Sequence, residues 1–157
     1  MSECRSAQDK AKEIIRIVIK GSSGYGPVEE AFEDKVVITR DSIRYEYTPY
    51  LASETNPVRK WSYKTTSPIF QKEFDTLALL MPKVMTMEGF FVKDVGAITF
   101  TITYSDKSRG EREFFLPGDD FKQVFSVIKT MVPGCEYVPA VLLTSEDYEE
   151  NEIRGDN

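Results

Sequence analysis

Two stretches of sequence decide the fold: Phe70-x-x-x-Phe74-x-x-Leu77-x-x-x-Met81-Pro82 and Phe121-x-x-x-Phe125-x-x-Ile128-x-x-x-Val132-Pro133. In each stretch large apolar residues recur at spacings of three and four, the pattern of an amphipathic helix that buries one face. Ser67-Pro68 is a helix-start signal, and the proline that closes each stretch is a signal for the end or a bend of the helix. We therefore predict two helices, each of which needs an apolar layer to pack against.

The two stretches also match each other at a shift of 51 residues without a gap. The match extends to apolar residues before the helices and after them, where residues 90–92 fall on residues 141–143. It also places Cys135 where Val84 stands, which predicts a small buried apolar role for that cysteine. Self-similarity of this kind is typical of an internal repeat. We predict pseudo-repeats at about residues 43–92 and 97–143, each built as strand-strand-helix.

Outside the helices the chain alternates between β-rich segments and turn signals. Ala97 to Tyr104 alternates threonines with larger apolar residues, which predicts a strand with one buried face. Five further strands are expected at residues 14–20, 36–39, 43–48, 59–65 and 111–116. Short loops join strands in pairs, so the sheet should be mainly antiparallel. The predicted fold class is α+β: a two-layer sandwich with a six-stranded sheet and two helices on one face.

Alternation along the strands assigns each side chain to one face of the sheet. The positions expected to face the helices are Ile15, Ile17, Ile19, Ile43, Tyr45, Tyr47, Trp61, Tyr63, Ile98, Phe100, Ile102 and Phe114. The last strand fits this scheme poorly, because Glu111, Glu113 and Phe115 then share the outer face. We expect a β-bulge or a register slip there.

Composition limits the possible functions. With 157 residues, 41% of them hydrophobic and 29% charged, the chain can bury a core of its own. It contains no histidine, which removes the commonest general base and metal ligand. Its two cysteines are too few for a disulfide framework, and no signal peptide or apolar span is apparent. We expect a cytoplasmic protein without cofactor, metal site or membrane contact, and the balance is against an enzyme.

The net charge of −6 is concentrated at one end of the chain. Residues 145–157 hold six of the 26 acidic residues and one of the 20 basic ones, so residues 1–144 hold 20 acidic and 19 basic residues. We predict a single domain over residues 1–144 and a disordered acidic tail over residues 145–157.

The outer face of the sheet is the first candidate site. Its expected residues are Arg16, Lys20, Arg44, Lys60, Lys64, Thr99, Thr101 and Thr103. The body of the chain is nearly neutral and the aromatic residues are assigned to the other face, so we expect no nucleic acid there. The alternatives are an ordinary solvated face or a docking surface. The leading hypothesis is a non-enzymatic protein-interaction module that contacts a protein partner or forms a homodimer.

The segment from Gly21 to Asp34 is the second candidate. It begins as a glycine- and serine-rich stretch and ends in a group of carboxylates, but it lacks the Gly-Lys-Ser/Thr ending of a phosphate-binding loop. A flexible loop between strands explains its composition. The alternative function is a small-molecule-binding protein or an enzyme with a pocket near this loop. Its aromatic neighbours would be Tyr45, Tyr47, Tyr50, Trp61 and Tyr63.

Overall fold

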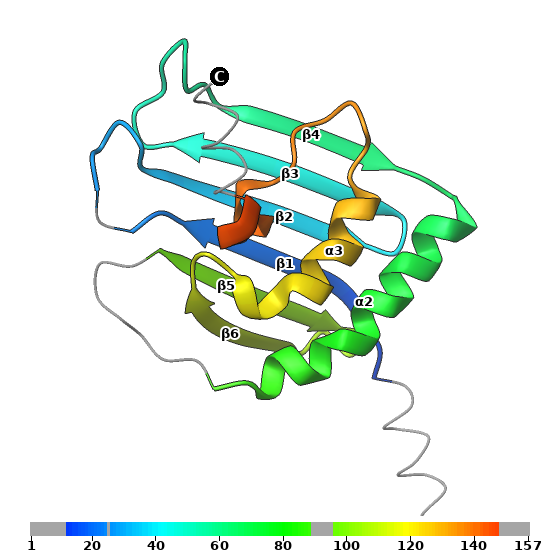
Figure 1. Ribbon diagram of the computed structural model, residues 1–157. Helices are drawn as coiled ribbons and strands as arrows, with labels where there is room; N and C mark the ends of the chain where they lie inside the picture. Colours follow the sequence, from blue (N-terminus) through cyan, green and yellow to red (C-terminus); the bar gives the residue numbers. More distant parts are fainter. Residues whose placement is uncertain (1–11, 25, 89–95, 148–157) are drawn as a thin grey trace, which may run out of the picture.

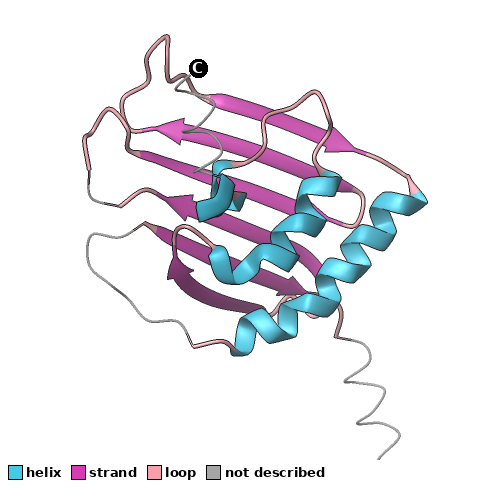
Figure 2. Ribbon diagram, in the orientation of Figure 1, coloured by secondary structure: helices cyan, strands magenta, loops and turns pink. Residues whose placement is uncertain are grey.

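The computed structural model describes residues 12–24, 26–88 and 96–147, and within them it forms two layers (Figures 1 and 2). One layer is a sheet of six strands: β1 (Ile14–Ser22), β2 (Phe32–Thr39), β3 (Ser42–Pro49), β4 (Arg59–Lys64), β5 (Ala97–Tyr104) and β6 (Arg109–Phe115). The other layer holds helices α2 (Pro68–Thr86) and α3 (Lys122–Met131) and the short 3-10 helices η1 (Asp119–Phe121) and η2 (Ala140–Leu142).

The strand order is β4-β3-β2-β1-β5-β6, and every neighbouring pair is antiparallel. The chain runs from β1 to β4 as a meander, and α2 then leads back across the sheet to β5, which pairs with β1 (Figure 1). Both helices lie on the same face. These features confirm the predicted two-layer α+β sandwich.

The core lies between the sheet and the helices and is largely the one that alternation predicts. Ten of the twelve positions assigned to the helix side are buried, whereas Ile15 and Tyr63 are 46% and 40% exposed. Ile15 is exposed because the register of β1 against β5 shifts between Ile14 and Arg16. Tyr63 lies near the end of edge strand β4, where Phe70 is its one aromatic neighbour among the described residues, at 6.1 Å between ring centroids.

The bulge that we expected in the last strand is absent from it. β6 pairs with β5 without a shift from Ala97–Phe115 to Thr103–Arg109, so that prediction was wrong. Glu111 and Glu113 share the outer face as alternation requires. Both are exposed on an edge strand, where water can solvate their carboxylates, so the register needs no correction.

Strands β1 and β2 and helix α2 are longer than predicted. β2 begins at Phe32 and β1 extends to Ser22, so Gly21–Asp34 and Ser22–Glu33 are strand pairs and the connecting loop covers only residues 23–31. Helix α2 continues beyond Pro82 to Thr86. Met81, which precedes this proline, and Val84, one residue further on than its C-terminal neighbour, are both buried in the core. Their burial offsets the loss of the backbone hydrogen bond that proline cannot donate.

The internal duplication remains a prediction. Helix α2 has 19 residues and α3 has 10. Val84 is buried within α2, whereas its counterpart Cys135 follows the end of α3 and is exposed, so the buried role predicted for Cys135 was wrong. The predicted match of residues 90–92 with 141–143 cannot be compared, because residues 89–95 lie outside the described ranges.

The segment that follows α3 is fastened to the rest of the molecule by hydrogen bonds. The Trp61 indole N–H donates to the carbonyl of Tyr137 at 3.1 Å, and the backbone N–H of Ser145 donates to Asp119 at 2.8 Å. Lys129 forms an ion pair with Asp147 at 3.0 Å. These contacts include the first residues of the predicted acidic tail. The rest of that tail, residues 148–157, lies outside the described part of the chain, so its disorder stays a prediction.

Candidate binding face

The face of the sheet without helices carries all eight residues that the sequence assigned to it. We call it the open face. Lys20, Arg44, Lys60 and Lys64 are exposed there, and Arg16 and the three threonines of β5 are partly buried. The structure divides this set. Arg16, Arg44 and Lys64 line one hollow, Lys20 and Thr99 line a second, and Lys60 pairs with Glu46 at 3.8 Å. Thr101 and Thr103 line neither of these two hollows.

The first hollow, which we call the cationic hollow, has a volume of about 450 Å³. Its lining residues are Arg16, Val37, Thr39, Ser42, Ile43, Arg44, Ser62, Tyr63 and Lys64. The lining contains three basic residues and no acidic one. Within the described ranges, the ion pairs found do not involve any of these three cations.

The strand register explains why a hollow forms at this place. Ser42 pairs with Thr39 on one side and with Lys64 on the other. Arg16 is one residue beyond the Ile17–Ile38 pair, so it falls opposite Thr39. Two long cationic side chains therefore flank two short hydroxyl-bearing ones, and the difference in length leaves a depression between them. The Ser42 and Thr39 hydroxyls are 2.6 Å apart, and Thr39 donates to Asp41 at 2.8 Å.

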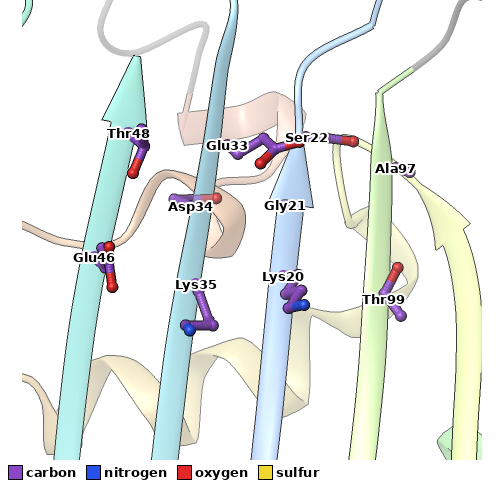
Figure 3. A pocket seen from close by; sticks show the side chains of 10 residues that line it. All are labelled: Lys20, Gly21, Ser22, Glu33, Asp34, Lys35, Glu46, Thr48, Ala97 and Thr99. Atoms are coloured by element: carbon purple, nitrogen blue, oxygen red, sulfur yellow. The ribbon is translucent and has the colours of Figure 1, made fainter. Parts of the chain in front are cut away.

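The second hollow, which we call the mixed hollow, has a volume of about 350 Å³ and lies toward the other end of β1 and β2 (Figure 3). Lys20 and Lys35 are direct cross-strand partners in it, and Glu33 and Glu46 stand beside them. Asp34, between Glu33 and Lys35 on β2, also lines this hollow, so its lining has two basic and three acidic residues. From the sequence, Glu33 was assigned to the carboxylate group of the Gly21–Asp34 segment and not to the open face, and Lys35 was missed, because β2 was predicted to begin at Val36. Alternation carried back three residues would have placed both on the open face.

Two valines form an apolar centre on the open face. Val18 and Val37 are cross-strand partners in β1 and β2, and their exposed fractions are 8% and 7%. Within the described part of the chain no helix covers this side, so neighbouring side chains on the same face must shield them, as the alkyl stems of Arg16 and Lys20 can. An apolar centre within a polar surround is typical of the core and rim of protein interfaces. The sequence analysis did not single out these valines.

Asp34, from the predicted group of carboxylates, is on the opposite side of the sheet from Glu33. Its Oδ2 accepts the Tyr45 hydroxyl at 2.8 Å and the backbone N–H of Val141 at 2.9 Å. The Tyr45 oxygen in turn accepts the N–H of Ala140 at 3.2 Å. Asp34 therefore holds η2 against the sheet. Burial raises the pKa of Asp34 to about 6 and also raises the pKa of Tyr45.

Gly21 makes this arrangement possible, which leads to a stability prediction. A Cβ atom at position 21 would lie 2.5 Å from Asp34 Oδ1 and 2.8 Å from two carbons of Val141. We expect Gly21→Ala to lower the free energy of unfolding by about 1–3 kcal/mol, because η2 or Asp34 must move. Urea denaturation measures this. Gly26→Ala is the matched control, since nothing lies within 4 Å of its Cβ, and an equal loss in both variants would contradict the prediction.

The aromatic residues near the first long loop serve mainly in packing. Tyr45 packs against Trp61 at 5.8 Å and Tyr47 against Phe32 at 5.4 Å between ring centroids. Tyr50 is 73% exposed and lines a further hollow of about 400 Å³. The structure thus does not bring the five aromatic residues together around one cavity.

Three further findings bear on class and function. Comparisons with protein-family models, with curated proteins and with solved structures find no match for the chain. Neither helix of the described residues is long and apolar enough to cross a membrane. The described residues also contain no group of three or more His, Cys, Asp or Glu side chains placed to hold a metal ion. The class that fold and site define is a two-layer α+β domain with a hollowed, partly cationic open face.

Proposed function

We propose that the protein is a non-enzymatic protein-interaction module of the cytoplasm whose open face contacts a partner protein or a second copy of the chain. The observation that carries this proposal is the apolar pair Val18 and Val37, shielded at the centre of a sheet face that no described helix covers. The cations of the cationic hollow lie near this pair, and none of them takes part in the ion pairs found among the described residues. A partner of opposite charge can compensate the cost of removing water from these cations.

The distribution of chemical groups favours binding over catalysis. A general acid or base has to lie close to the reacting group and to a second functional side chain. The strongly shifted carboxyl group, Asp34, lies on the helix side and uses its hydrogen bonds to fasten η2. Cys135 is exposed, and the chain has no histidine to activate it.

Thr101→Arg tests the proposal. Thr101 is opposite Val18, so an arginine there places a long charged side chain over the apolar centre. We expect the variant to keep its thermal stability. If the contact is with a partner protein, the amount of partner bound should fall at least about tenfold; if it is with a second copy of the chain, the dimer should dissociate to a monomer. Native mass spectrometry reports self-association, and affinity purification with quantification reports a partner.

The matched control is Gln123→Arg, which adds the same side chain at an exposed position on α3. It should behave as the wild type does. If both variants keep the partner, or if both lose it equally, the open face is not the contact surface and the proposal is wrong.

A second candidate function is supported by the mixed hollow. Its volume of about 350 Å³ and its lining of two basic and three acidic residues suit a small zwitterionic molecule. Such a ligand would add a mass of a few hundred daltons in native mass spectrometry, lost on denaturation. Lys20→Ala combined with Lys35→Ala should abolish that added mass, whereas Thr101→Arg should leave it unchanged.

A further inference from the structure

We propose that the cationic hollow binds an acidic peptide segment of the partner protein, with carboxylates of that segment seated on Arg16, Arg44 and Lys64. This inference rests on the proposed function and names the chemistry of its partner.

The charge of the cationic hollow favours an acidic ligand. The lining of the cationic hollow carries three positive charges and no negative one. The acidic residues of the open face do not line this hollow: Glu33 is in the mixed hollow, Glu46 is two positions from Arg44 on β3 and pairs with Lys60, and Glu111 and Glu113 are on β6 at the far edge of the sheet. Asp41, in the β2–β3 turn, accepts the Thr39 hydroxyl but does not line the hollow. An incoming carboxylate would therefore meet uncompensated positive charge.

The length of the cationic hollow favours a peptide over a single small anion. Arg16 on β1 and Lys64 on β4 are separated by three gaps between strands, about 14 Å at the usual strand spacing. This span favours a ligand longer than a single phosphate or carboxylate. An extended peptide covers this distance with about four or five residues. Two of its acidic side chains could contact the two ends of the hollow, and Arg44 could hold a third by a two-pronged hydrogen bond.

The mixed charge of the open face favours a peptide over a nucleic acid. A nucleic-acid strand is a continuous polyanion that prefers a uniformly basic surface with aromatic residues for stacking. The open face instead carries Glu33, Glu46, Glu111 and Glu113 among its cations. Tyr63 is the aromatic residue of the cationic hollow, and its ring packs against Phe70 of α2. Discrete carboxylates on a peptide fit this mixed surface better.

The test uses the full-length protein and a fluorescein-labelled decaglutamate peptide, with binding followed by fluorescence anisotropy. We expect the wild type to bind decaglutamate, to ignore decaglutamine, and to lose affinity as salt is raised from about 50 mM to about 500 mM. Arg44→Glu should weaken binding at least about tenfold. Lys64→Glu serves as a second variant, and a thermal melt of each variant shows that it is folded.

Lys72→Glu is the matched control. Lys72 is exposed on α2, so Lys72→Glu has the same net charge as Arg44→Glu but leaves the open face unchanged. Its affinity for decaglutamate should stay within about twofold of that of the wild type. Equal weakening by Arg44→Glu and Lys72→Glu would overturn the proposal, because it would show a response to net charge alone. Tighter binding of a ten-residue oligothymidine than of decaglutamate would overturn it in favour of nucleic acid.

The outcomes also separate this inference from the proposed function. If decaglutamate does not bind while Thr101→Arg still removes the partner, the open face is the contact surface and only the acidic-peptide inference is wrong. If Thr101→Arg has no effect on the partner, the proposed function is wrong, whatever the peptide does.

Discussion

Replacing Phe100 by alanine should lower the free energy of unfolding by about 3–5 kcal/mol, the largest change that we expect from a single substitution. Phe100 is fully buried on β5. Its ring lies 5.9 Å from Phe114, 5.0 Å from Phe121 and 6.4 Å from Phe125, measured between centroids. It therefore joins the sheet to η1 and α3. Its removal leaves a cavity that three rigid rings cannot fill, and urea denaturation measures the loss.

Leu79→Ala is the control for this prediction. Leu79 is on α2 but is 81% exposed, so its truncation removes little buried surface. We expect a change within about 0.5 kcal/mol. A Phe100→Ala variant as stable as Leu79→Ala would show that the ring cluster is not the core of this half of the molecule.

The second large effect is a dependence of stability on pH that arises from Asp34. Burial raises the pKa of Asp34 from 3.8 to about 6, so between these values the folded state binds a proton more tightly than the unfolded state does. The stability that Asp34 contributes is thus fully present below about pH 4 and is lost as the pH rises through 6. A shift of this size corresponds to about 3 kcal/mol.

The measurement compares the wild type with Asp34→Asn by urea denaturation between about pH 3 and pH 8. Hydrogen bonds lower the pKa of Asp119 and Asp147, and their contribution is lost in the opposite direction, as the pH falls through their folded pKa values. Both aspartates are present in the wild type and in the variant, so their effects cancel when the two free energies of unfolding are subtracted. We expect the free energy of unfolding of the variant to rise by about 3 kcal/mol relative to that of the wild type as the pH rises. A difference independent of pH would mean that Asp34 is not buried as described.

Much of the fold could be predicted from the sequence because its signals are local. The alternation of β5 and the helical spacing of Phe70, Phe74 and Leu77 depend only on the geometry of a strand and of a helix. The features that were missed depend on tertiary contacts. The exposure of Ile15 follows from a shift of β1 against β5, and the continuation of α2 past Pro82 follows from burial of Val84 on the sheet.

The candidate site could be predicted only as a list of residues on one face. Which of them share a hollow depends on the register between strands, which no single strand encodes. The cationic hollow exists because short Thr39 and Ser42 fall between long Arg16 and Lys64. In the same way, Lys20 and Lys35 become neighbours only through the pairing of β1 with β2. A correct boundary for β2 would have supplied Lys35 but not this pairing.

The central claim, that the protein acts through its open face, is tested most directly by site-specific photo-crosslinking. A photoreactive amino acid is placed at position 101 on the open face or at position 123 on α3, and both variants are irradiated in living cells. We expect one discrete crosslinked species from position 101, weakened by Arg44→Glu, and none from position 123. A discrete species from position 123 with none from position 101 would contradict it.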